Sequence, residues 1–121
     1  MRSILTLLAL GLAISPAIAA DWPMYKGNAA RNGYTEEALP ANLVERWHIK
    51  ERHAPMPAWP ASTRLGFDRA HQPVVVGDTF YYGSTADCHV YARDVATGAK
   101  RWRYCTGGPI RFAPAVWKDR L

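Results

Sequence analysis

The sequence has little cysteine and no strong excess of charge. It contains 2 Cys among 121 residues, and 15 Lys and Arg stand against 10 Asp and Glu. Two cysteines cannot build a disulfide-dense scaffold, and no C-x-x-C-H segment is present to attach a haem. The basic residues are scattered, whereas a nucleic-acid footprint is clustered on one element. The sequence therefore predicts no nucleic-acid partner.

A long apolar run is also lacking after the first twenty residues, which read MRSILTLLALGLAISPAIAA. An early Arg2, an apolar stretch at 4–14 and an A-x-A end are typical of a secretory signal peptide. A membrane-spanning helix needs about 20 apolar residues, and Pro16 interrupts this run. We predict a signal peptide over residues 1–19, cleaved after Ala19 or Ala20. The mature protein is then periplasmic or secreted, with no membrane span after cleavage.

Three regions follow before the strand-rich part of the chain. Residues 20–42 show neither helical nor strand periodicity, which predicts an irregular segment. Residues 43–50 (LVERWHIK) have a period of two, which predicts a half-buried strand. Residues 51–72 include the proline-rich stretch APMPAWP. Proline fixes φ and removes a backbone donor, so an extended connection is expected there.

The remainder predicts an all-β meander. Short strands are expected at 73–76, 79–84, 88–93 and 100–104, separated by turns that contain glycine or polar residues. No segment after the signal peptide has a convincing helical period. Four short antiparallel strands joined by tight turns are therefore the expected fold unit.

The chain also contains an internal repeat. PVVVGDTF at 73–80 aligns with PAVWKDRL at 114–121, an offset of 41 residues. A four-stranded repeat of about 40–45 residues is typical of a propeller blade. Residues 73–105 are predicted to form blade one, and residues 106–121 the start of a truncated blade two. Because a lone blade cannot bury both faces, the remaining blades of a longer chain are the expected partners. The alternative is a complete small protein that oligomerises into a ring.

A specific motif lies at the predicted third turn. Residues 91–102 read YARDVATGAKRW and fit A-x-D-x-x-T-G-x-x-x-W through Ala92, Asp94, Thr97, Gly98 and Trp102. Asp94 can accept backbone N–H groups within a turn, and Gly98 can supply a left-handed residue. Trp102 is expected to pack against an adjacent blade. The pattern resembles the tryptophan-docking motif of the pyrroloquinoline-quinone (PQQ)-type β-propellers.

The resemblance covers nearly all of the mature chain. The opening DWPMYKGN at 21–28 is similar to the start of this quinoprotein alcohol dehydrogenase-like superfamily. Residues 43–50, with Trp47, look like the outer strand that closes the ring in relatives. Residues 109–117 (PIRFAPAVW) resemble exported bacterial PQQ-like repeat proteins grouped with the outer-membrane assembly propeller lipoprotein.

The resemblance implies two classes of function. One is a binding or assembly scaffold, with envelope proteins as partners and without catalysis in this segment. The other is a quinoprotein dehydrogenase that uses PQQ and calcium to oxidise an alcohol or a sugar. Such enzymes carry a vicinal Cys-Cys pair, which is absent here, and the four His have no metal-ligand spacing. Apart from Arg111, which is considered next, the sequence itself shows no cofactor site, no metal site and no catalytic residue.

Two further predictions concern the end of the blade where the second turn and the exit from the fourth strand meet. If the third turn centres on 96–97, positions whose numbers sum to 193 face each other, as Cys88 and Cys105 do. Opposed residues are close enough for a disulfide, although a shift of one residue would leave two free thiols.

Arg111 is expected to point toward the propeller axis, where it could bind an anionic cofactor or ligand.

Overall fold

The computed structural model describes residues 20–57 and 70–121. The predicted signal peptide and part of the proline-rich connection lie outside these residues. The described residues contain four strands and no helix: β1 (Val74–Val76), β2 (Thr79–Gly83), β3 (His89–Asp94) and β4 (Lys100–Cys105). The all-β prediction is confirmed, and each strand begins and ends within one residue of its predicted position.

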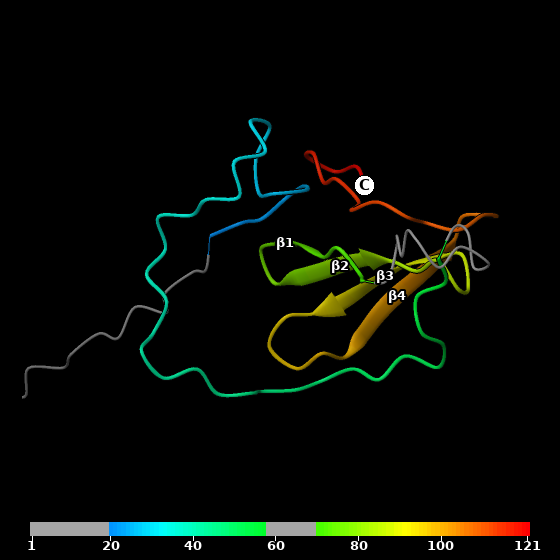
Figure 1. Cartoon of the computed structure of the whole chain (residues 1–121), viewed down its shortest axis with the longest axis horizontal. Coiled ribbons are helices and arrows are strands. Elements are labelled where there is room, and N and C mark those ends of the chain that lie inside the picture. Colours follow the sequence, from blue (N-terminus) through cyan, green and yellow to red (C-terminus); the bar gives the residue numbers. More distant parts are fainter. Residues whose placement is uncertain (1–19, 58–69) are drawn as a thin grey trace, which may run out of the picture.

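The strands form one antiparallel sheet in the order β1-β2-β3-β4, as in a propeller blade (Figure 1). Val74 pairs with Tyr81, Tyr81 with Ala92, and Ala92 with Trp102. The tight turn before β2 contains Gly77 at φ 57°. This left-handed conformation costs glycine little.

The register of the β3–β4 hairpin differs from the predicted one. His89 pairs with Cys105, and a β-bulge between Ala92 and Arg93 shifts the ladder by one residue. Cys88 then lies beyond the end of β3, where its carbonyl accepts the N–H of Thr106 at 2.9 Å. Both cysteines are free in the structure. The predicted pairing of Cys88 with Cys105 is therefore wrong, because a bulge moves every position on one side of it to a new partner.

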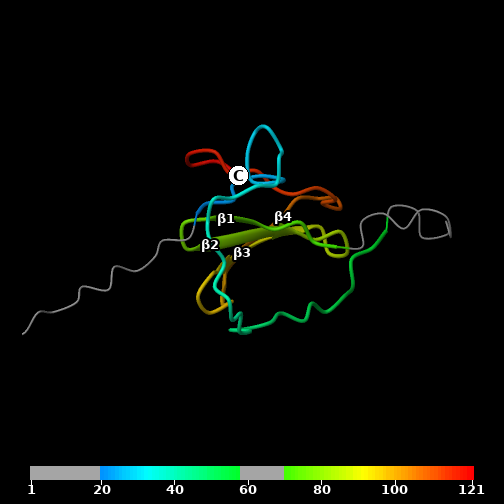
Figure 2. The same cartoon turned by 60° about the vertical axis from the view of Figure 1, so that its left-hand side comes forward.

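Irregular segments cover both faces of the sheet. Figure 2 shows residues 20–30 (blue) and the C-terminal segment (orange to red) on one side, and residues 43–57 (teal to green) on the other. Val74 is fully buried and Tyr82 is 2% exposed. We expected that a lone blade could not bury both of its faces. For these two side chains that expectation is wrong, because flanking segments of the same chain lie on both sides of the sheet.

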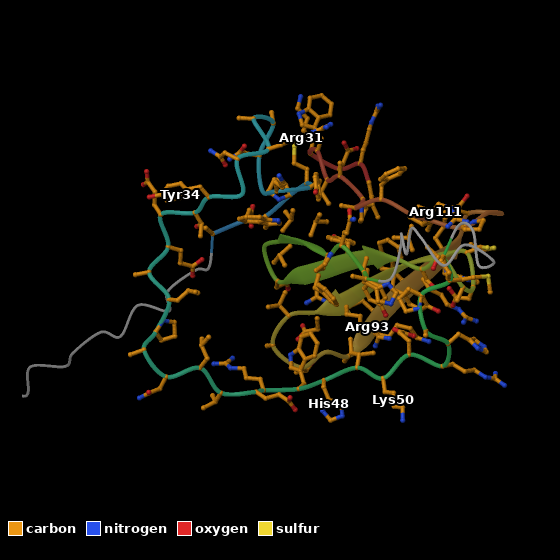
Figure 3. All side chains as sticks on the ribbon, viewed as in Figure 1. Arg31, Tyr34, His48, Lys50, Arg93 and Arg111 are labelled. Atoms are coloured by element: carbon orange, nitrogen blue, oxygen red, sulfur yellow. The ribbon has the colours of Figure 1, made fainter. Side chains whose placement is uncertain are left out.

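Residues 43–50 do not form a strand within the described part of the chain. The predicted alternation is visible only in the second half, where Trp47 and Ile49 are half-buried and His48 and Lys50 are exposed. Figure 3 shows His48 and Lys50 pointing away from the sheet. Residues 43–50 could close a propeller ring only by pairing with a strand of another blade. Their ring-closing role therefore stays a prediction.

The N-terminal segment joins equivalent positions of the two repeats. Trp22 and Val75 exchange both backbone hydrogen bonds, at 2.7 and 2.9 Å. The next residue, Pro23, accepts the N–H of Val116 at 2.8 Å. Val75 and Val116 are 41 residues apart, which is the offset of the sequence repeat. The segment thus lies along the first strand of the blade and along the corresponding stretch of the next repeat.

Across residues 20–57 and 70–121, no helix has the length and apolar character needed to cross a membrane.

Candidate functional site

The turn between β3 and β4 has the geometry that its motif predicts. The Oδ1 atom of Asp94 accepts hydrogen bonds from the N–H and the hydroxyl of Thr97, both at 2.9 Å. Gly98 has φ 70° and donates its N–H to the carbonyl of Asp94 at 2.8 Å. Ala92 is fully buried in the strand that leads into this turn. These residues fix the shape of the turn.

The tryptophan that packs on this turn is Trp47, not the Trp102 of the motif. Its Nε1–H donates to the carbonyl of Val95 at 2.9 Å. Its ring lies so close to Gly98 that a Cβ there would be 2.8 Å from a ring carbon. Trp102 is 42% exposed and contacts Tyr81 at a ring-centroid distance of 5.9 Å. The packing of Trp102 against an adjacent blade stays a prediction, and the role of Trp47 was not anticipated.

Arg101 links the two turns at this end of the sheet. Its guanidinium donates to both carboxylate oxygens of Asp78, at 2.8 and 2.7 Å, and to Oδ2 of Asp94 at 2.6 Å. The hydrogen bond from Arg101, followed by that from Thr97, lowers the pKa of Asp94 to about 2. Both carboxylates are therefore held as structural anions at neutral pH.

A second polar cluster fastens residues 43–57 to the sheet. The hydroxyl of Tyr82 donates to Glu51, and Arg93 donates to both the Tyr82 oxygen (3.0 Å) and Glu51 (3.3 Å). Burial, reinforced by the hydrogen bond to Glu51, raises the pKa of Tyr82. Figure 3 shows Arg93 between the sheet and this segment. Glu51 was predicted only as part of a connection, and nothing in its local sequence signals this contact.

The opposite end of the sheet forms the rim, which consists of residues 84–88 and 106–112. Ile110 donates its N–H to the carbonyl of Ser84 at 3.3 Å, so the two parts lie side by side as predicted. The Ile110 side chain occupies the space that a Cβ atom on residue 83 would need. Glycine at this position lets the second part of the rim approach the sheet closely.

Asp87 is the acidic residue of the rim. It accepts a hydrogen bond from the hydroxyl of Tyr91, and its own N–H donates to Ser84 Oγ at 3.4 Å. Burial opposes ionisation of Asp87, but the hydrogen bonds from Ser84 and Tyr91 outweigh it and lower the pKa. His89 lies nearby, with Nδ1 2.6 Å from the Asp87 carbonyl oxygen. The carboxylate and its neighbours thus shape the second turn.

Arg111 is half-buried on the wall of an apolar groove of about 930 Å³. The groove runs along β4, with Trp102 and Tyr104 on one wall and residues 108–115 on the other. Arg111 lies in the second part of the rim (Figure 3), and its orientation toward a propeller axis stays a prediction. Its binding of an anionic ligand stays a prediction.

The histidines are dispersed over the blade and its flanking segments. His71 contacts the carbonyl of Gly83 at 3.0 Å, and His48 contacts Glu45 at 3.0 Å on the outer side of residues 43–50. Within the part of the chain that the structure describes, no three His, Cys, Asp or Glu side chains are grouped closely enough to hold a metal ion.

Comparison with known proteins relates the chain to a quinoprotein. Quinoprotein glucose dehydrogenase from Escherichia coli (strain K12) is 31% identical over 97 residues. The alignment covers 76% of this chain and 12% of that enzyme, so the chain spans a small part of its relative. No family profile and no solved structure matches the chain. The chain is therefore similar to a PQQ-like quinoprotein over most of its own length.

Proposed function

We propose that this chain forms the first blade of an exported PQQ-like β-propeller that acts as a binding or assembly scaffold in the cell envelope. The observation that carries the proposal is that the carboxylates of the blade are engaged in hydrogen bonds within the blade itself. Residues 73–105 contain three, Asp78, Asp87 and Asp94. Each accepts a hydrogen bond from a side chain of the same blade. They stabilise turns, and the loops of the rim remain as the surface for a partner.

A second candidate is a dehydrogenase that oxidises an alcohol or a sugar. It is favoured by the similarity to quinoprotein glucose dehydrogenase. PQQ would supply the electron acceptor in such an enzyme, and calcium would polarise it. The described residues offer no grouped ligands for calcium, so we assign no step of that chemistry to them. Arg111 is the residue of this chain that would meet a carboxylate of the quinone.

One experiment separates the two candidates. The full-length protein is purified from the envelope and mixed with PQQ and calcium, and reduction of an artificial dye is followed with glucose or ethanol. The scaffold proposal expects no PQQ-dependent reduction. Dye reduction that requires both PQQ and a substrate would overturn it in favour of the dehydrogenase. Sequencing of the mature N-terminus, expected at Ala20 or Asp21, tests the export that both candidates require.

The scaffold is tested directly through its rim. A defined envelope protein that co-purifies in a fixed ratio is expected to be lost when Arg111 in the rim is replaced by Gln (Arg111→Gln). A matched control is Arg46→Gln, which alters an exposed arginine that does not line the groove beside Arg111. Equal recovery of the partner with the rim variant and with the control would contradict the assignment of the rim as the binding surface.

A further inference from the structure

A recess next to the rim lies between the N-terminal segment and the beginning of the second repeat. It has a volume of about 430 Å³ and is lined by Met24, Tyr25, Arg31, Gln72 and residues 112–115. Small-ligand sites occupy about 300–1,000 Å³, so the recess is large enough for a compact organic molecule. It shares residues 112–115 with the wall of the groove along β4, whereas Arg111 lines the groove and not the recess.

The chain positions both walls of the recess through backbone contacts. One wall is the loop after Trp22, which is closed by hydrogen bonds from Arg31 N–H to the Asn28 carbonyl (2.9 Å) and from Gly33 N–H to the Lys26 carbonyl (3.1 Å). This loop lies beside the C-terminal segment in Figure 1, and Figure 3 shows Arg31 on it. The hydrogen bonds give Arg31 a defined backbone position at the mouth of the recess.

The opposite wall is fixed by Gln72. Its Oε1 atom accepts the N–H of Ala113 at 3.2 Å. The two residues are 41 positions apart, so this contact also joins corresponding parts of the two repeats. Because the amide oxygen of Gln72 is used, the group that it can offer to a ligand is its NH2 donor.

The polar side chains of the recess are suited to an anion. Arg31 provides guanidinium N–H groups, Gln72 an amide NH2 and Tyr25 a hydroxyl. Among the described residues, no Asp or Glu lines the recess. The other side chains, Met24, Phe112 and Pro114 among them, are apolar. A ligand that satisfies both kinds of surface carries a negative group on an apolar body.

We propose that the recess binds a small carboxylate with an aromatic or branched apolar body, and that Arg31 pairs with the carboxylate. The guanidinium fork matches the two oxygens of a carboxylate, which makes arginine the preferred residue for this contact. The apolar body lies against Met24 and Phe112. The site is formed by two repeats and the N-terminal segment together, so the ligand would also stabilise their association.

The test uses the full-length protein and benzoate as the probe, with binding measured by isothermal titration calorimetry. Benzoate is expected to bind, whereas benzyl alcohol, of similar size and without charge, binds at least tenfold more weakly. Arg31→Gln is expected to weaken benzoate binding by about tenfold or more, since a hydrogen-bonded charge pair is lost. Arg31→Lys keeps the positive charge but not the forked guanidinium. Its affinity for benzoate should therefore lie between those of the unaltered protein and of Arg31→Gln.

The control variant is Arg46→Gln, which removes an exposed arginine outside the recess. It should bind benzoate as the unaltered protein does, and circular dichroism should show that all variants are folded. The proposal is overturned if benzoate fails to bind at millimolar concentration or if benzyl alcohol binds equally well. Equal binding by Arg31→Gln would overturn it too. Arg31 and Arg46 lie outside the rim, so none of these results bears on the scaffold proposal.

Discussion

Gly98 occupies the point at which the β3–β4 turn and Trp47 meet. Its φ of 70° lies in the left-handed region, and a Cβ would stand 2.8 Å from the Trp47 ring. An L-residue in this conformation costs about 1–2 kcal/mol, and the contact with the ring adds to this cost. We expect Gly98→Ala to lower the free energy of unfolding by more than about 2 kcal/mol, as measured by denaturant titration of the full-length protein.

Gly107 provides the matched control for this prediction. It has φ 75°, but no atom of the residues that the structure describes lies within 4 Å of the position that a Cβ would occupy. Gly107→Ala should therefore show only the cost of the left-handed backbone, about 1–2 kcal/mol. If both substitutions have the same effect, Trp47 does not dock on Gly98 in solution.

At the same scale, the sequence predicted the local contacts of the turn motif and missed the distant ones. The bonds of Asp94 to Thr97 span three residues, and turn chemistry is sufficient to predict them. Trp47 bonds to Val95 across 48 residues, and Arg93 bonds to Glu51 across 42. Such contacts depend on the path of a proline-rich connection, which neither periodicity nor turn signals define.

At the scale of elements, strand positions were predictable and the register of one hairpin was not. Alternating side chains and glycine-containing turns predict where β1–β4 lie. The β-bulge at Ala92 and Arg93 has no comparable sequence signal, and it shifts the end of the hairpin by one residue. The flanking segments were likewise not predicted to cover both faces of the sheet, since they have no period of their own.

The register that the bulge sets predicts that the two cysteines are free thiols. Cys88 and Cys105 are free and are not paired across β3 and β4. Thiol titration of the denatured, unreduced chain, which contains only these two cysteines, should give two thiols per chain. The same titration after reduction is the control and should give the same value. A rise of two thiols on reduction would show a disulfide and contradict this register.

At the scale of the whole molecule, the two repeats are held together at their corresponding positions. Trp22 bonds to Val75, Pro23 to Val116, and Gln72 to Ala113. The offset of 41 residues in the sequence is thus matched by contacts between equivalent stretches. Within residues 20–57 and 70–121, no further strand pairs with the outer edge of β4, and β4 is exposed along its whole length. Its outer edge carries backbone groups that could pair with a further strand.

The exposed side of β4 predicts how this 121-residue chain behaves by itself. Tyr104 is 67% exposed, Phe112 81% and Trp102 42%, and all three line the groove along β4. Exposed apolar surface next to an unpaired strand edge favours association. We expect the isolated mature chain to form oligomers whose mass rises with concentration in analytical ultracentrifugation.

Replacing Trp102 and Tyr104 by serine and threonine should reduce this association. Val44→Thr is the control, since Val44 is 80% exposed but lies outside the groove. A monomer that unfolds in one cooperative transition would contradict the need for a neighbouring blade.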